Sequence, residues 1–297
     1  MRTLVFTMIA LCFGLQAMAQ ATGPAEFLQS YLWHVDHPQF GGFSGLELSD
    51  DGNDLVTLSD RTSLWRAHIT RDAQGRITAV APTENPITLH DYRDREMTVS
   101  RGDSEGLALA PDGGVYVSFE GDLPRVDHYA KGSSRAGKLP RAVEFKNMQA
   151  NASLEALAVD QSGALYTLPE RSGRSGLAFP VFELKNNRWS RPFSIPREGE
   201  WQAVGADFGP DGRLYLLERD FWGLLGFLTR VQVFDVKNGK LSGGEVLLQT
   251  TAGHHDNLEG LSVWRDAAGF IRLTMISDDN FRKILQRTEI VEYRLPK

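Results

Sequence analysis

The sequence predicts an all-β fold, because one short hairpin unit recurs five times along its 297 residues. In each copy an apolar, strand-like segment is followed by a polar turn that contains glycine, and then by a second apolar segment that ends in acidic residues. Long helical patterns are absent between the copies. The copies lie about 50 to 60 residues apart, which is the period of a propeller blade, and begin at Ser44, Ser104, Leu154, Ala203 and Leu258.

The first 19 residues have the pattern of a signal peptide. Arg2 precedes an apolar run from Leu4 to Leu15, which is too short to span a membrane, and Ala17 and Ala19 form a small-x-small cleavage pattern. The sole cysteine of the chain lies within this run, so the mature protein would have no disulfide and no cysteine metal ligand. We therefore predict a signal peptide over residues 1–19 and a periplasmic or secreted domain over residues 20–297.

The turns and the strands that follow them define the blades. Four of the five turns contain an Asp-Gly or Ser-Gly pair, which favours tight hairpins because glycine accepts a positive φ. A third strand-like segment follows each hairpin, over residues 64–70, 125–131, 180–186, 230–236 and 288–295. A fourth is expected where more apolar residues follow, as in residues 141–146 and 244–250. Four strands per unit are typical of a propeller blade.

The fifth unit lacks a fourth strand, because the sequence ends after the third. The segment over residues 30–35 precedes the first unit and has no other partner, so we expect it to complete the last blade. The sequence thus predicts a single closed β-propeller with five four-stranded blades. Six blades are the alternative, if the long first interval contains a degenerate unit.

Composition and motifs exclude several function classes. The chain carries 32 Lys and Arg residues against 38 Asp and Glu residues, a formal net charge of −6, which argues against a nucleic-acid surface. Beyond the signal peptide, no apolar run is long enough to span a membrane. The sequence contains no G-x-S-x-G elbow, no P-loop and no H-E-x-x-H motif. We expect a monomer that binds a small anionic or ester substrate.

The repeat gathers acidic residues at one end of the predicted channel. In a propeller the first strand of each blade lines the channel and the second runs antiparallel to it, so the start of one and the end of the other share a face. Acidic residues at these positions are Asp60, Glu105, Glu120, Glu155, Glu170, Glu218, Glu259 and Asp278. Glu218 is the weakest member, because it follows its aligned tyrosine by three residues rather than four, and Arg219 takes the aligned position.

Facing carboxylates repel one another unless a cation or shared protons relieve them. We expect a divalent cation, Ca²⁺ ahead of Mg²⁺, and the predicted oxygen ligands are Glu105, Glu155, Glu259 and Asn257. We expect Arg61, Arg171 and Arg219 either to contact the substrate or to neutralise part of this group of acidic residues. Glu120 and Glu170 are expected to contact the substrate beside them. The candidate catalytic acids and bases are Asp60, Asp278, His254 and His255.

Two further segments are expected near this face. Residues 221–228 form an apolar stretch in the fourth unit, which walls a substrate pocket, covers the blade core or simply begins the third strand. Residues 90–95, in the long insert of the first unit, are highly charged. Their arginines would either meet an anionic substrate or stay solvated.

The ordered motifs resemble the bacterial phytase-like family, described as having esterase-like activity of phytase. They include GGFSGLELS with LSDR, DSEGLALAPDGG with SFEG, SLEALAVD with LPER, LYLLERDF, and NLEGLSVW with SDDN. The resemblance implies an exported propeller that hydrolyses esters or phosphoesters, and it carries over the acids and arginines of these motifs, including Asp279 and Asn280. The R-H-G-x-R-x-P signature of acid phosphatases is absent, so any phytase activity would depend on a metal.

The leading hypothesis is therefore a metal-dependent hydrolase of phosphate or carboxylic esters. A calcium-dependent lactonase is a related alternative, because other calcium propellers open cyclic esters. A noncatalytic propeller is the alternative from a different class. It would bind a ligand on the acidic face and use any metal only for structure.

Overall fold

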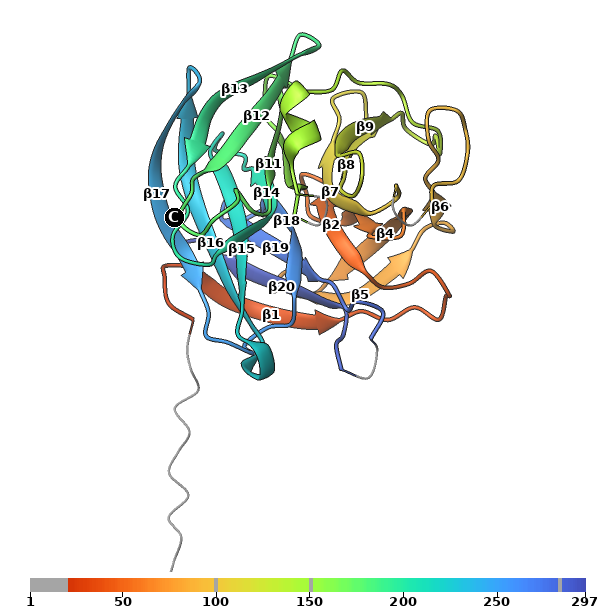
Figure 1. Ribbon diagram of the computed structural model, residues 1–297. Helices are drawn as coiled ribbons and strands as arrows, with labels where there is room; N and C mark the ends of the chain where they lie inside the picture. The colour runs from red at the N-terminus through yellow and green to blue at the C-terminus, as the bar shows by residue number, and fades with distance from the viewer. Residues whose placement is uncertain (1–20, 99–100, 150–151, 283–284) are drawn as a thin grey trace, which may run out of the picture.

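The computed structural model describes residues 21–98, 101–149, 152–282 and 285–297, which form five sheets around a central axis (Figure 1). The predicted signal peptide over residues 1–19 lies outside the described residues. Within the described ranges, no helix has the length and apolar character needed to cross a bilayer. The prediction of a five-bladed propeller is confirmed, and the long first interval holds an insert rather than a sixth blade.

The blades follow one another along the chain, and their neighbouring strands are antiparallel. The first contains β2 (Phe43–Leu48), β3 (Asp54–Ser59), β4 (Ser63–Arg71) and β5 (Ile77–Pro82), with β6 (Ile87–Thr88) beside β4. The second contains β7 (Ser104–Leu109), β8 (Val115–Phe119) and β9 (Arg125–Tyr129). The third contains β10 (Leu154–Val159), β11 (Leu165–Pro169), β12 (Phe179–Lys185) and β13 (Arg188–Ile195). The fourth contains β14 (Gln202–Phe208), β15 (Leu214–Phe221), β16 (Phe227–Lys237) and β17 (Lys240–Gln249).

The fifth blade joins the two ends of the chain. It consists of β18 (Leu258–Arg265), β19 (Ile271–Ser277), β20 (Glu289–Arg294) and β1 (Glu26–Leu32). Strand β1 pairs antiparallel with β20, from Leu32 opposite Glu289 to Glu26 opposite Arg294. The predicted closure is confirmed, although the strand begins earlier than residue 30 and ends at Leu32.

The second blade departs from the prediction. Its sheet has three strands among the described residues, and residues 141–146, predicted as a fourth strand, instead contain the 3₁₀ helix η1 (Val143–Asn147). Ala142 and Phe145 are both buried, and a separation of three residues suits one 3₁₀ turn rather than the alternation of a strand. The ring of Phe145 packs edge-on against Phe182 and Trp189 of the next blade, with centroids 5.3 and 5.1 Å apart.

The innermost strands approach one another closely at one repeated position, which is glycine in four blades and Ala156 in the third. A Cβ added to Gly106 would lie 2.3 Å from the carbonyl oxygen of Glu155, and one added to Gly205 would lie 2.4 Å from that of Glu259. The cavity left along the axis is about 10 Å³, the space of roughly one water. The centre of the channel is therefore filled, and a ligand must bind at one of its ends.

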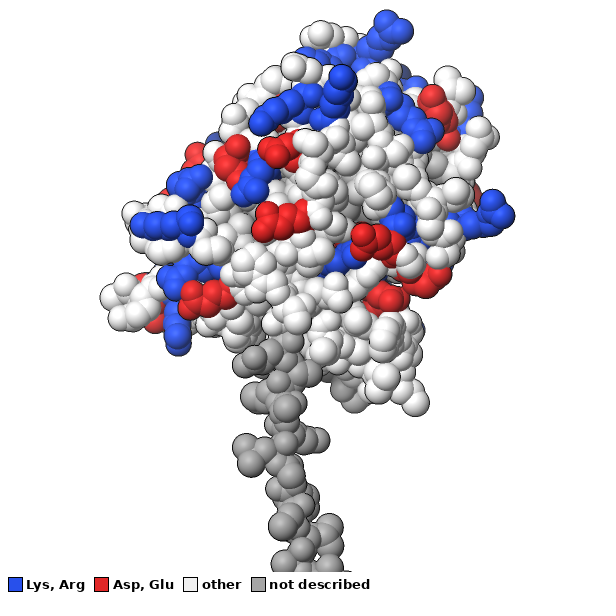
Figure 2. All heavy atoms as spheres, turned by 90° about the vertical axis from the view of Figure 1, so that its left-hand side faces the viewer, with Lys and Arg blue, Asp and Glu red and all other residues white. Residues whose placement is uncertain are grey.

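Charged side chains on the outer surface are mixed in sign. On the side where β17 lies, Lys and Arg are interspersed with Asp and Glu, without a broad area of one sign (Figure 2). Lys237 and Asp235 of β16 form such a pair, with Nζ and Oδ1 3.8 Å apart. Solvated pairs of this kind add little to stability. The unusual charges of this protein lie instead at the mouth of the channel.

Candidate functional site

Every innermost strand carries a β-bulge at the same point. In each blade the register between the first and second strands shifts at this point, so that the first strand has residues without a partner on the second. These residues are Ser44, Glu105 with Gly106, Glu155, Val204 and Glu259. A bulge bends its strand and re-aims a side chain, and bulges are common next to functional sites. The three glutamates predicted as metal ligands are therefore all bulge residues.

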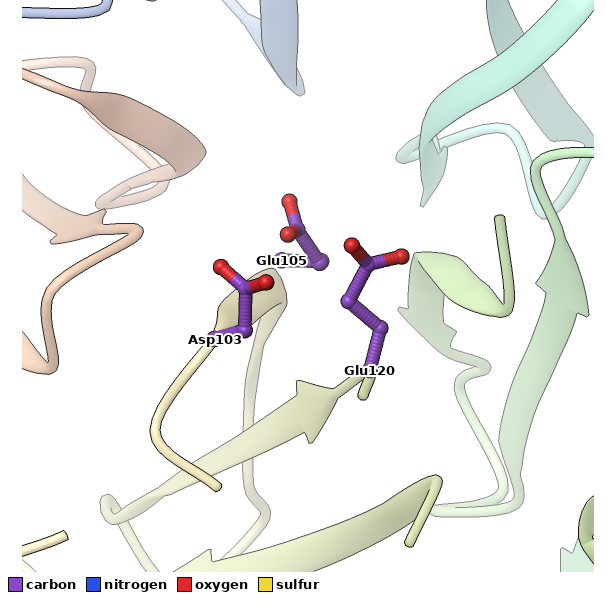
Figure 3. A group of neighbouring side chains, drawn as sticks. All are labelled: Asp103, Glu105 and Glu120. Atoms are coloured by element: carbon purple, nitrogen blue, oxygen red, sulfur yellow. The ribbon is translucent and has the colours of Figure 1, made fainter. Parts of the chain in front are cut away.

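Three carboxylates of the second blade converge at the channel mouth (Figure 3). Asp103 directly precedes β7, Glu105 is the second residue of that strand, and Glu120 directly follows β8. One carboxylate oxygen of each lies within 4.8 Å of the other two, so the group could hold a metal ion. The backbone N–H of Glu120 donates to the carbonyl oxygen of Asp103 over 3.0 Å and ties the two segments together.

The carboxyl groups of the mouth disfavour one another's charged forms. Burial raises the pKa of Glu105 well above its ordinary value, and the charge of Glu120 adds to this effect. Burial, together with nearby acids, raises the pKa of Glu120 to about 8 and that of Asp278 to about 8. Burial also raises the pKa of Asp60 to about 7. A bound cation would relieve this repulsion.

Arg219, at the end of β15, neutralises another part of the mouth. It donates to Asn257 Oδ1 over 2.8 Å and to Glu170 Oε1 over 3.1 Å, and it forms a close ion pair with Glu259. Burial and the charge of Glu170 raise the pKa of Glu155, and the charge of Arg219 opposes them.

The structure thus divides the ligand set predicted from the sequence. Glu105 belongs to the carboxylate group of the second blade, whereas Glu259 and Asn257 contact the Arg219 guanidinium. Glu155 lies between them, since the charges of both Glu105 and Arg219 act on its pKa.

Glu218 does not join the mouth. It is completely buried in the fourth blade, where it accepts hydrogen bonds from Arg230 Nε over 2.7 Å and from Gln232 Nε2 over 2.8 Å. Glu218 pairs with Ala203 in the register of β14 and β15, and it precedes Arg219 by one residue. The shortened offset in the sequence identified this exception, because a slip of one residue turns a side chain to the other face.

The other predicted arginines lie at the edge of the mouth. Arg171 is next to Glu170, with Nε and Oε2 3.6 Å apart. The guanidinium of Arg61 stacks over the ring of Phe281, 3.5 Å from its centroid. Asp279 accepts backbone hydrogen bonds from Gly42 and Phe281 over 2.8 and 3.0 Å, so it fixes the loop that follows β19.

The two adjacent histidines lie against the aromatic part of the last blade. His255 is buried, its Nε2 lies 2.7 Å from the Tyr293 hydroxyl, and burial lowers its pKa to about 3. The exposed His254 packs near the ring of Phe27, with centroids 6.3 Å apart. Among the described residues, no hydrogen bond or ion pair joins either ring to the carboxylates of the mouth. Their acid–base role stays a prediction.

Asp103 is the member of the carboxylate group that the sequence analysis missed. It precedes Glu105 by two residues, and side chains at that spacing in an extended chain project to the same side. The motif Asp-Ser-Glu therefore contained the signal. Burial raises the pKa of Asp103 as it does for its neighbours.

The apolar segment over residues 221–228 extends into solvent. It forms the short 3₁₀ helix η2 (Gly223–Leu225), with Trp222, Leu224 and Leu225 exposed. Phe227 begins β16, as one of the interpretations expected.

A family model covers the part of the chain that contains the acidic residues of the mouth. A model of the phytase-like family, described as esterase-like activity of phytase, matches residues 38–281. The chain belongs to this family. The matched range runs from the segment before β2 to the loop after β19, and therefore includes every acidic residue of the mouth described above. No curated protein matches the sequence.

Solved structures resemble the chain at low sequence identity. An alpha-L-arabinofuranosidase from Podospora anserina, in complex with cellotriose, is 10% identical with a TM-score of 0.54, and the match covers 93% of this chain and 98% of that chain. A protein of unknown function from Bacteroides caccae is 9% identical with a TM-score of 0.46, over 89% and 85%. The Dos1 propeller is 10% identical with a TM-score of 0.39, over 80% and 53%. The first of these likenesses supports the fold alone, and the other two are too remote to support an argument.

The raised pKa values predict that the metal-free protein loses stability as pH rises. A carboxyl group with a higher pKa in the folded chain keeps a proton that the unfolded chain releases, so the free energy of unfolding falls between about pH 4 and pH 8. We expect the melting temperature of chelator-treated protein to drop by about 5 °C or more from pH 5 to pH 8.5 in calorimetry. Glu105→Gln should show a smaller drop, and a melting temperature that rises over this range would contradict the prediction.

Proposed function

We propose that this chain is an exported, metal-dependent hydrolase of phosphate or carboxylic esters. The convergence of Asp103, Glu105 and Glu120 within 4.8 Å at the channel mouth carries the proposal. The family description, esterase-like activity of phytase, supports ester hydrolysis. The signal-peptide pattern over residues 1–19 supports a periplasmic or secreted location.

The residues present fit a hard divalent cation. Every donor in the group is a carboxylate oxygen, and residues 20–297 contain no cysteine. Ca²⁺ accepts several carboxylates in irregular geometry more readily than Mg²⁺ does, so we favour Ca²⁺. Asp103, Glu105 and Glu120 would hold the ion, and its charge would relieve the repulsion that raises their pKa values.

A bound cation would polarise the ester or phosphoryl oxygen and offset the negative charge that develops there. Asp60 and Asp278, whose pKa values are raised to about 7 and about 8, would exchange protons with the substrate or with water near neutral pH. The backbone N–H of Asn280 donates to Asp278 Oδ1 over 2.6 Å and orients this carboxyl group. Arg61 and Arg171, at the edge of the mouth, would contact the anionic part of the substrate.

One observation favours a noncatalytic, ligand-binding propeller as the second candidate. Arg219 forms ion pairs with both Glu170 and Glu259, as in a purely structural network. Within the hydrolase proposal, a lactone is the alternative substrate class, because ring opening places the same demands on the cation and the acid–base pair.

Calorimetric titration of Ca²⁺ into chelator-treated protein tests the proposal first. We expect saturable binding that releases protons at pH 7, because the carboxyl groups must ionise to bind the ion. A panel of 4-nitrophenyl phosphate, 4-nitrophenyl acetate and simple lactones then tests turnover, which chelation should lower by at least about 100-fold. Saturable binding without turnover of any of these compounds would favour the ligand-binding propeller. Absence of Ca²⁺ binding, or turnover that survives chelation, would overturn the metal-dependent mechanism.

A further inference from the structure

A cavity of about 480 Å³ lies between the second blade and the described part of the insert of the first blade, residues 83–98 and 101–102. This volume is in the range of small-molecule sites. Although the chain is acidic overall, five arginines line the cavity, namely Arg93, Arg95, Arg101, Arg125 and Arg141, against three carboxylates, namely Asp91, Glu96 and Asp127. The insert that the sequence analysis described as a charged loop therefore forms one wall of a cationic cavity.

Two of the five arginines are held by partners in the wall. Arg125 is buried, and its Nε donates to Asp127 Oδ2 over 2.7 Å while its guanidinium stacks on Phe119, 4.0 Å from the ring centroid. Arg95 donates to Asp91 Oδ2 from both Nε and Nη2, over 3.0 and 2.7 Å. These pairs build the wall and offer little charge to a ligand.

The other three arginines differ: Arg141 also acts electrostatically on Asp127, whose carboxylate Arg125 already pairs, whereas the charges of Arg93 and Arg101 stay available to a ligand. Within the part of the chain that the structure describes, no ion pair joins Arg93, Arg101 or Arg141 to a carboxylate. The carbonyl oxygen of Arg101 accepts a hydrogen bond from Arg125 Nη2 over 3.0 Å, which fixes its backbone at the cavity. Arg125 and Arg141 share the single carboxylate of Asp127, and Arg93 and Arg101 have none within ion-pair distance among the described residues, so the cavity suits an anion such as phosphate or carboxylate.

The same cavity has an apolar side. Tyr92, Met97 and Leu123 contribute to its wall, and Leu123 is exposed at 43%. The guanidinium of Arg93 lies over the Tyr92 ring, 5.3 Å from its centroid. An exposed leucine beside unpaired arginines favours a ligand that combines an anionic group with an apolar body over a bare inorganic ion.

The cavity adjoins the carboxylate group of the mouth through the chain itself. Arg101 precedes Asp103 by two residues, and Leu123 follows Glu120 by three. Both segments that carry the carboxylates thus continue directly into the cavity wall.

We propose that this cavity binds an organic anion, that is, a phosphate or carboxylate on an apolar body. The binding does not depend on hydrolysis. Its use as the subsite that positions the substrate beside Asp103, Glu105 and Glu120 rests on the proposed function.

Binding is measured by calorimetry on chelator-treated protein with phenyl phosphate, benzoate and inorganic phosphate, so that neither a metal nor turnover contributes. Phenyl phosphate or benzoate should bind more tightly than inorganic phosphate, and which of the two binds best identifies the anionic group. Arg101→Gln and Arg141→Gln should each weaken that binding by about fivefold or more. Arg188→Gln, which removes an exposed arginine of β13 outside the cavity, should leave the affinity unchanged.

Binding that persists unchanged in both cavity variants, or no binding of any of the three probes, would overturn the proposal. If the hydrolase proposal also holds, Arg141→Gln should raise KM for an aryl phosphate ester with little change in kcat. The substitution removes a group that binds the substrate and leaves the reacting groups in place. A protein that binds phenyl phosphate but hydrolyses nothing would keep the cavity assignment and refute only the proposed reaction.

Discussion

Replacing Glu105 by glutamine is expected to weaken Ca²⁺ binding strongly and to lower ester turnover by at least about 100-fold. The amide keeps the shape of the side chain but removes one of the three charges that converge within 4.8 Å. The two remaining carboxylates, Asp103 and Glu120, attract a hard cation less strongly. The same change should not destabilise the metal-free fold at pH 8, because burial and neighbouring charges disfavour ionised Glu105.

This combination separates a functional carboxylate from a structural one. Calorimetry gives Ca²⁺ affinity, a 4-nitrophenyl ester assay gives turnover, and thermal unfolding with chelator present gives stability. Glu245→Gln is the matched control, since Glu245 is an exposed residue of β17. Turnover of Glu105→Gln at the wild-type rate would remove the carboxylate group of the second blade from the mechanism.

Replacing Arg230 by methionine should lower the free energy of unfolding by about 3–5 kcal/mol. Glu218 is completely buried and would keep only Gln232 as a hydrogen-bond donor among the described residues, without a cation to compensate its charge. Denaturant unfolding measures this loss. Folded Arg230→Met should still bind Ca²⁺ with wild-type affinity, because the pair lies in the fourth blade and not at the mouth.

A second variant tests whether the loss comes from the uncompensated charge. Adding Glu218→Gln to Arg230→Met should restore part of the lost stability, since the buried charge is then absent. Arg188→Met, at an exposed site of β13, serves as the control for the substitution itself. A loss below about 1 kcal/mol in Arg230→Met would contradict the prediction and show that Glu218 carries no uncompensated charge in the variant, either by taking up a proton or by reaching water.

Much of the fold could be predicted because propeller blades repeat. The Asp-Gly turns and the spacing of the copies gave the five hairpins, and the missing last strand indicated closure by the N-terminal segment. The helix η1 could not be predicted in this way. Its short apolar segment fits either a strand or a turn. The position of Phe145 depends on contacts with Phe182 and Trp189 of another blade.

The site was predictable only as a set of positions. Repeat alignment identified the acids of the mouth other than Asp103, and the exception at Glu218, because both depend on register. The alignment could not show that Arg219 forms ion pairs with Glu259 and Glu170. These pairs depend on the conformation of a long side chain that extends from the fourth blade to its two neighbours. Nor could the alignment show that the insert and the second blade enclose a cavity.

Closure of the ring by β1 and β20 also constrains how the molecule folds. These strands are the first and last of the described chain, so the ring remains open until its final strand has been made. Joining the ends of so long a segment carries a large loop-closure entropy, and contacts of such sequence separation slow folding. Loss of residues 289–297, which contain β20, would therefore leave β1 an unpaired sheet edge, exposed to strands of other chains.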